Sequence, residues 1–82
     1  MTEPTLFVGI DVAKAKFDVA LLTPEGKYRS KVFPNYPAGH QHFVDWLDQH
    51  KARGAHLCME ATGAYGRNLA RFLAQQQLLV SV

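Results

Sequence analysis

LFVGID, at residues 6–11, and HLCME, at residues 56–60, are two short apolar runs that each end in a carboxylate. Apolar runs of this length, bounded by turn signals, predict buried strands in a sheet that is covered on both faces. A carboxylate at the C-terminal end of such a strand lies at the rim of the sheet, where open α/β sheets bind their ligands. The two runs therefore predict one sheet edge that carries both Asp11 and Glu60.

The distance between these two carboxylates decides what they can do. If their strands are neighbours, the strand ends lie roughly 5 Å apart. Two carboxylates at that spacing can share divalent metal ions, as in the two-metal sites of nucleases and polymerases. The alternative is structural, because Asp11 is also suited to a turn and Glu60 to a helix N-terminus. The occurrence of both acids in the same setting favours the metal site.

The N-terminal half of the chain predicts an antiparallel meander. A second strand is expected at residues 17–22, and the sequence TPEG at residues 23–26 is typical of a turn. Residues 27–33 alternate in character and predict a third strand at an edge of the sheet. Pro37 suits the first turn of a helix, and Gly54 is the expected C-terminal cap of that helix. Phe43, Trp46, Leu47 and His50 follow the spacing of this first helix.

The C-terminal half predicts a second helix between two strands. Thr62 is the expected N-cap, and residues 78–82 begin a last strand. The order βββαβαβ is that of a mixed α/β sheet in which a helical crossover brings the Glu60 strand beside the Asp11 strand, parallel to it. The expected buried stripe of the second helix is Tyr65, Leu69, Phe72, Leu73 and Gln76.

Composition limits the alternatives. The chain has 82 residues, 48% of them apolar and 20% charged, which is typical of one small folded domain and not of a disordered chain. A net charge of +2 permits a nucleic-acid partner without requiring one. The single cysteine, Cys58, is expected in the core, which excludes a disulfide framework. No signal peptide or membrane-spanning run is present in these residues.

Two motifs resemble a known family. GIDVAK at residues 9–14, followed by FDVAL at residues 17–21, resembles the opening of the DEDD-type transposases of bacterial insertion sequences. MEATGAY at residues 59–65 resembles their second signature. The resemblance covers essentially the whole chain. It implies a ribonuclease H-like fold similar to that of the Holliday-junction resolvase RuvC, with residues 1–82 as the N-terminal part of that catalytic domain.

The resemblance also implies a chemistry. Asp11 and Glu60 align with the first two of four metal-binding acids, so the implied cofactor is Mg²⁺ or Mn²⁺. The later aspartate pair and a serine-bearing C-terminal domain are expected beyond Val82, and residues 1–82 alone are expected to be inactive. The implied partners are DNA, a structured guide RNA and further copies of the protein, in the bacterial cytoplasm at the nucleoid and without a membrane. Because the last strand is expected to have an unpaired edge, the piece itself is expected to dimerise or aggregate.

Four basic residues are candidate nucleic-acid contacts. Lys14 and Lys16 follow Asp11, and Arg67 and Arg71 are spaced four apart on the second helix. Each pair fits either phosphate contacts or a solvated surface. His40, His42, His50 and His56 show no metal-ligand spacing and are expected at the surface or the edge of the core.

Two other function classes remain open on residues alone. One is an actin-like or sugar-kinase ATPase, whose phosphate hairpin needs a glycine where residues 12–14 read VAK. The other is a nucleic-acid-binding module without catalysis, in which Asp11 and Glu60 are structural.

Overall fold

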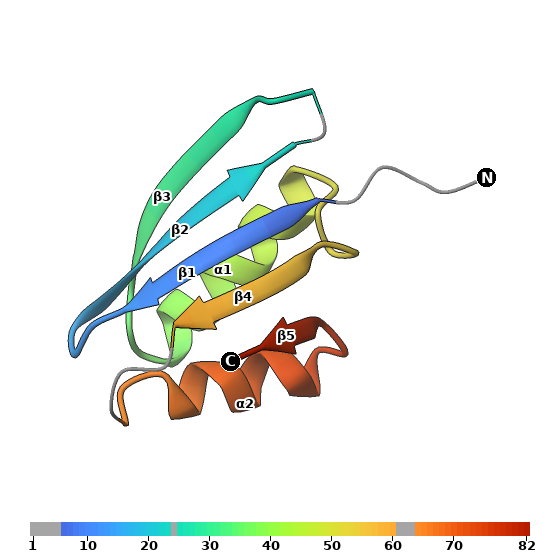
Figure 1. The fold of residues 1–82 in the computed structure, drawn as a ribbon. Helices are drawn as coiled ribbons and strands as arrows, with labels where there is room; N and C mark the ends of the chain where they lie inside the picture. The colour runs from blue at the N-terminus through green and yellow to red at the C-terminus, as the bar shows by residue number, and fades with distance from the viewer. Residues whose placement is uncertain (1–5, 24, 61–63) are drawn as a thin grey trace.

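The structure is a computed structural model that describes residues 6–23, 25–60 and 64–82. One five-stranded sheet has the order β3-β2-β1-β4-β5 (Figure 1). The strands are β1 (Phe7–Val12), β2 (Lys16–Leu22), β3 (Tyr28–Pro34), β4 (His56–Glu60) and β5 (Leu79–Ser81), and the helices are α1 (Pro37–Gln49) and α2 (Arg67–Gln75). The predicted order of elements is confirmed.

The sheet is mixed, as predicted. β1 pairs with β2 and β2 with β3 in antiparallel fashion, whereas β1 pairs with β4 and β4 with β5 in parallel. α1 carries the chain from β3, at one edge, across to β4 on the far side of β1. The β1 strand is therefore central, with β2 on one side and β4 on the other, and the fold is ribonuclease H-like.

Both helices lie on one face of the sheet, and the other face is open (Figure 1). In β1 the burial alternates residue by residue, so Val8, Ile10 and Val12 are buried while Phe7 is 47% exposed. The prediction of strands covered on both faces is therefore wrong. Cys58 shows the same error, because it belongs to the open face and is exposed instead of lying in the core.

The core lies between the sheet and the helices. Phe17 is at its centre, with its ring centroid 5.5 Å from those of both Phe33 and Phe43. Trp46 extends this aromatic cluster, with its ring centroid 6.0 Å from that of Phe33. Phe43, Trp46 and Leu47 are buried, and His50 is exposed and follows the helix as its C-cap.

The helix ends differ from the prediction. Pro37 begins α1 as expected, but the helix ends at Gln49 and not at Gly54. Lys51 adopts a positive φ of 54°, and Gln77 adopts one of 63° just after α2. Both helices therefore end with a non-glycine residue in the left-handed region, where a glycine is the usual choice.

α2 packs through a narrower stripe than predicted. Leu69 and Leu73 are fully buried and Phe72 and Gln76 are half-buried, but Tyr65 precedes the helix and is 50% exposed. The prediction for Tyr65 is wrong because α2 begins only at Arg67. The predicted cap, Thr62, lies outside the described residues.

Candidate metal centre

The sheet register brings Asp11 and Glu60 together. Their Cα atoms are partners in the parallel pairing of β1 with β4, and both side chains are exposed. The reason is the alternation of each strand, because burying Ile10 and Met59 turns the next residue to the open face. The predicted neighbourhood of the two carboxylates is thereby confirmed, at the C-terminal ends of two central strands.

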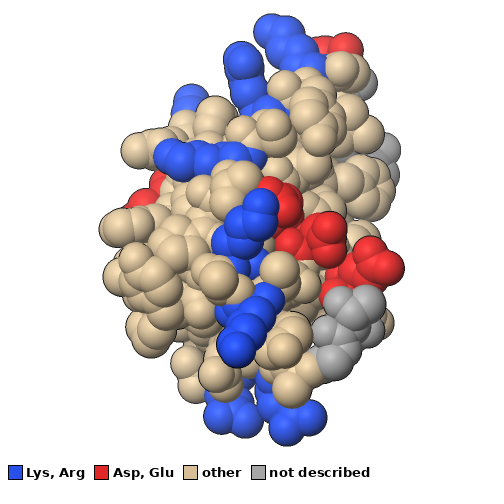
Figure 2. Space-filling model, turned by 90° about the vertical axis from the view of Figure 1, so that its left-hand side faces the viewer, with Lys and Arg blue, Asp and Glu red and all other residues tan. Residues whose placement is uncertain are grey.

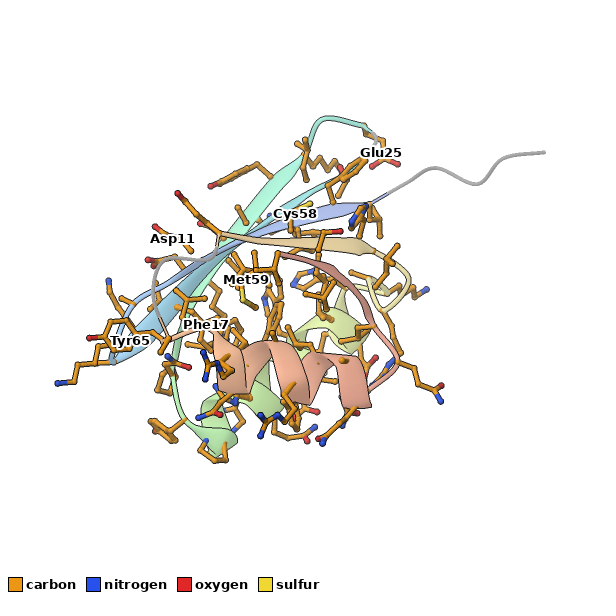
Figure 3. The ribbon with its side chains drawn as sticks, turned by 60° about the horizontal axis from the view of Figure 1, so that its bottom comes forward. Asp11, Phe17, Glu25, Cys58, Met59 and Tyr65 are labelled. Atoms are coloured by element: carbon orange, nitrogen blue, oxygen red, sulfur yellow. The ribbon has the colours of Figure 1, made fainter. Side chains whose placement is uncertain are left out.

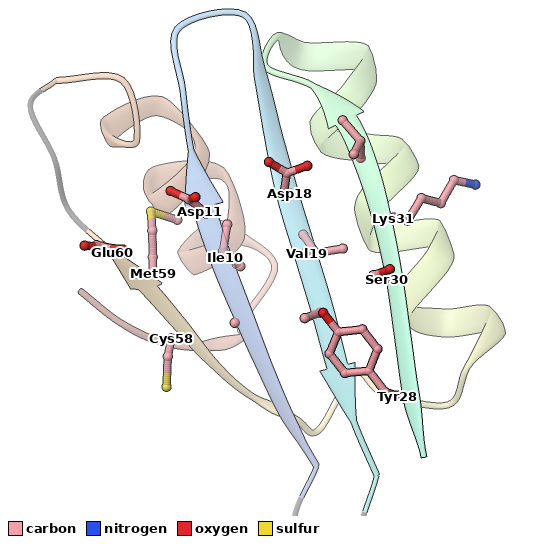
Figure 4. Close-up of a pocket in the computed structure, with 13 residues that line it drawn as sticks. Ile10, Asp11, Asp18, Val19, Tyr28, Ser30, Lys31, Cys58, Met59 and Glu60 are labelled. Carbon is pink, nitrogen blue, oxygen red and sulfur yellow. The ribbon is translucent and has the colours of Figure 1, made fainter. Parts of the chain in front are cut away.

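A third carboxylate, Asp18, lies on the other side of Asp11. Asp18 is the antiparallel partner of Asp11 in β2 and is exposed on the same face. Figure 4 shows the three carboxylates on three adjacent strands, toward the same end of the sheet. The prediction missed Asp18, although the pairing of Val12 with Phe17 across the β1–β2 turn places residue 18 opposite residue 11.

These acids lie at one end of a shallow hollow on the open face. The hollow has a volume of about 890 Å³, and its other walls are mainly apolar and neutral. Figure 4 shows Cys58, Tyr28 and Ser30 further along it, away from the acids. Besides the three acids, the hollow is lined by Gly9, Ile10, Val19, Ala20, Tyr28, Ser30, Lys31, Val32, Cys58 and Met59.

The donor set fits part of a divalent-metal site. Carboxylate oxygens are the ligands that Mg²⁺ prefers, and like charges that face each other across paired strands are destabilising unless something compensates them. Within residues 6–23, 25–60 and 64–82, no group of three or more His, Cys, Asp or Glu side chains is arranged closely enough to hold a metal ion. On their own, the described acids do not make a complete coordination shell.

Basic side chains surround the same end of the molecule. Figure 2 views that end, where acidic side chains gather and basic side chains run beside them. Lys14 lies in the β1–β2 turn, Lys16 begins β2, and Arg67 and Arg71 lie on the exposed side of α2. The structure brings Lys14 and Arg71 to one groove, which neither Lys16 nor Arg67 lines.

One histidine is part of the core. His40 is only 4% exposed, and its Nε2 donates to Oδ1 of Asn35 at 2.9 Å. This direction follows because Nδ2 of Asn35 donates to the carbonyl oxygens of Ala13 and Tyr65, which leaves Oδ1 as the acceptor. Burial lowers the pKa of His40, so the ring is neutral at pH 7. The prediction of surface or core-edge histidines therefore holds for His42, His50 and His56 but not for His40.

Comparison with known families places the chain in one of them. A family profile described as "Transposase", that of the DEDD-type enzymes, matches residues 8–82. The chain belongs to the DEDD-type transposases. The matched residues include both sequence signatures and every described strand. Only Phe7, the first residue of β1, lies outside the match among the described strand residues.

Two curated relatives support the assignment. Both are named pilin gene-inverting protein; the one from Moraxella lacunata is 32% identical over 78 residues and the one from Moraxella bovis is 30% identical over 78 residues. Each alignment covers 93% of this chain and 24% of the relative. The chain therefore spans about a quarter of the length of these curated relatives.

One solved structure is similar at low identity. The Aquifex aeolicus member of the Ppx/GppA family aligns with 98% of this chain and 35% of its own, at 12% identity and a TM-score of 0.46. In the described part of the chain, no helix is long and apolar enough to cross a membrane.

Proposed function

We propose that this chain forms part of the catalytic centre of a DNA transposase or recombinase, in which Asp11 and Glu60 hold a divalent metal ion. The observation that supports the proposal is the parallel register that makes these two residues partners on the open face. The family assignment gives the reaction class, which is the breaking and rejoining of DNA strands. The curated relatives are named for the inversion of a gene, which is a rearrangement of that class.

The metal would be Mg²⁺ or Mn²⁺, held by Asp11 and Glu60. When bound, such an ion polarises a phosphodiester and neutralises the charge that develops on its oxygens. Magnesium requires about six oxygen ligands, so two carboxylates must be joined by water or by other residues. The resemblance assigns those residues to a later pair of aspartates.

The chain's own residues prepare the site in two ways. First, β1 and β4 fix the two carboxylates on a rigid sheet and not on loops, which keeps their spacing constant. Second, Asp18 adds negative charge directly beside Asp11, which attracts a cation to the site. The guide RNA, the association of several copies and the location at the nucleoid complete the proposal on the strength of the family resemblance alone.

Paramagnetic NMR tests the metal site directly. Added Mn²⁺ is expected to broaden the amide signals around Asp11 and Glu60 selectively, with weak affinity because most of the ligands are water. Asp11→Asn is expected to reduce this broadening strongly. Glu25→Gln is the matched control, because Glu25 is an exposed acid at the opposite end of the β2–β3 hairpin (Figure 3). Broadening that is equally strong in wild type and in Asp11→Asn would refute the site.

A second test uses strand transfer by the longer protein. Asp11→Asn and Glu60→Gln are each expected to abolish the joining of DNA while leaving the fold intact, because both side chains are exposed and contribute nothing to the core. Activity in either variant would contradict the proposal and favour the reading in which both acids are structural. Circular dichroism of each variant separates loss of chemistry from loss of folding.

The ATPase alternative makes a separate prediction. Its phosphate hairpin needs backbone amides that approach a nucleotide closely, and glycine allows that approach. Here the β1–β2 turn reads AKAK and closes with a hydrogen bond of 2.8 Å from the Ala13 amide to the Lys16 carbonyl. We therefore expect no ATP binding by calorimetry, and saturable binding at the β1–β2 turn would favour the alternative.

A further inference from the structure

A groove separate from the acidic site lies between the β1–β2 turn, the start of α1 and the exposed side of α2. Its volume is about 530 Å³. Elements that are far apart in the sequence meet here, because Lys14 comes from the turn and Arg71 from α2. The polar and aromatic residues that matter for its chemistry are Lys14, Asn35, Tyr36, Tyr65, Asn68 and Arg71.

The groove has a net positive charge. No aspartate or glutamate is among the residues that line it. In the part of the chain that the structure describes, the one ion pair joins Arg53 to Asp48, so neither Lys14 nor Arg71 is neutralised by a carboxylate there. His40 also lines the groove but is neutral, because burial lowers its pKa. The two cations therefore favour an anion at this place.

Two tyrosines flank the cations. Tyr36 comes just before α1 and is 54% exposed, and Tyr65 comes just before α2 and is 50% exposed. Half-exposed aromatic rings beside a positively charged groove are the combination with which proteins hold unpaired nucleotides, since bases stack on the rings while phosphates meet the cations. An inorganic anion or an acidic peptide would use the cations but not the rings.

One side chain makes the walls of the groove rigid. Nδ2 of Asn35 donates to the carbonyl oxygens of Ala13 and Tyr65, each at 3.0 Å, and Oδ1 accepts from His40 in α1. The backbone amide of Asn35 also donates to the carbonyl oxygen of Ala15 at 3.0 Å. The turn that carries Lys14 is thereby fixed relative to Tyr65, so a ligand meets a preorganised surface.

We propose that this groove binds an unpaired stretch of nucleic acid, with one backbone phosphate at Lys14, a second at Arg71 and a base stacked on Tyr65. DNA and RNA share this chemistry. The groove lies at the same end of the sheet as the carboxylates: Lys14 sits in the turn that follows the Asp11 strand, and Figure 3 shows Tyr65 and Asp11 at that end. The proposal rests on the groove's own contacts and needs no metal ion.

The test measures binding of fluorescent oligothymidylate and oligouridylate, about eight nucleotides long, in a buffer that contains a metal chelator. The double variant Lys14→Ala/Arg71→Ala is compared with Lys16→Ala/Arg67→Ala, which removes the same charge from the same turn and helix but outside the groove. The groove variant is expected to lower the salt dependence of binding by about 1.4 in log–log slope, because each phosphate contact on a single strand contributes about 0.7. The control is expected to keep the wild-type slope.

Tyr65 gives an independent readout. Tyr65→Ala is expected to weaken binding roughly 5- to 150-fold, the range for loss of one base-stacking ring, whereas Tyr65→Phe keeps the ring and the affinity. Only the side chain changes, so the hydrogen bond from Asn35 to the Tyr65 carbonyl remains. Binding of either oligonucleotide supports the proposal. A preference for one of them indicates whether the natural ligand of the groove is DNA or RNA.

Three results would overturn the inference. They are equal weakening by the groove variant and its control, unchanged affinity in Tyr65→Ala, and equally tight binding of a glutamate peptide of matched charge. Thermal unfolding of every variant confirms that it is folded. The binding buffer contains no divalent ion, so a negative result here says nothing against the proposed metal site. Conversely, loss of Mn²⁺ binding in Asp11→Asn says nothing against the groove.

Discussion

Alternate residues of the same strands face two different surroundings in this molecule. In β1, Val8 and Ile10 pack beneath the helices, while Gly9 and Asp11 face solvent on the open side. The covered face is aliphatic and aromatic throughout, and His40 is the one buried polar side chain among the described residues. The open face combines three carboxylates at one end with exposed apolar side chains elsewhere, such as Phe7 and Leu22. The first face determines the fold, and the second is available for partners and chemistry.

Truncating one large apolar side chain on each face gives the largest expected difference. Phe17→Ala removes a fully buried ring from the centre of the core and is expected to cost about 3–5 kcal/mol, which is enough to unfold a small domain. Leu22→Ala, in the same strand but 47% exposed on the open face, is expected to stay within about 0.5 kcal/mol. Urea unfolding monitored by circular dichroism measures both. Similar losses for the two variants would break the distinction between the faces.

The pH dependence of stability tests the buried histidine of the covered side. The pKa of His40 in the folded protein is lowered from 6.5 by burial, so the unfolded chain takes up the proton first as the pH falls. This contribution to stability is complete above the unfolded pKa and is lost as the pH drops below it. Thermal unfolding at a series of pH values is expected to show a decline that is smaller in His40→Gln. Identical pH profiles for wild type and His40→Gln would contradict this role of His40.

Removing a negative charge from the open face is expected to stabilise the fold, whereas truncating a core side chain destabilises it. Asp11 and Asp18 are directly opposed across the β1–β2 pair, and like charges in that position cost on the order of 0.2–1 kcal/mol. Asp18→Asn is therefore expected to raise the unfolding temperature, and more so at low salt because ions screen the repulsion. Glu25→Gln, in the distant turn, is the control. A lower unfolding temperature for Asp18→Asn would show that the carboxylate supports the fold.

Replacement of the Cys58 thiol is expected to have the smallest effect on stability. Cys58 is exposed on the open face, between the buried residues Leu57 and Met59. It is expected to react completely with a thiol reagent in the folded state, and Cys58→Ser is expected to change stability by less than about 0.5 kcal/mol. Slow labelling that requires unfolding would instead mean that this face is covered in solution.

Much of the fold was predictable because each element carries a local signal. Turn residues at 23–26, Pro37 at the start of α1 and the apolar spacing of Phe43 and Leu47 predict the element order. The crossover rule then leaves one place for β4, beside β1, and this brings Glu60 to Asp11. The central pair of the candidate site therefore followed from the order of the elements.

The errors have a common physical origin. Phe7, Gly9 and Cys58 are apolar or small although they lie on the open face, so β1 and β4 have the composition of strands covered on both sides. Composition cannot reveal which face lacks a helix, because that depends on where α1 and α2 pack. Gly54 and Tyr65 were misassigned for a related reason, since helix ends are set by tertiary packing and Lys51 accepts the strained position instead.

The parallel pairing of β1 with β4 has a consequence for how this sequence can vary over evolution. Leu57 and Met59 are buried in the same register that makes Glu60 the partner of Asp11. Inserting or deleting one residue inside β4 would turn either those two side chains or the carboxylate to the wrong face. Length changes are therefore expected to accumulate in the loop at residues 50–55 and to be absent from the strand. Selection for a folded core thus preserves the position of Glu60, even in copies whose chemistry is no longer under selection.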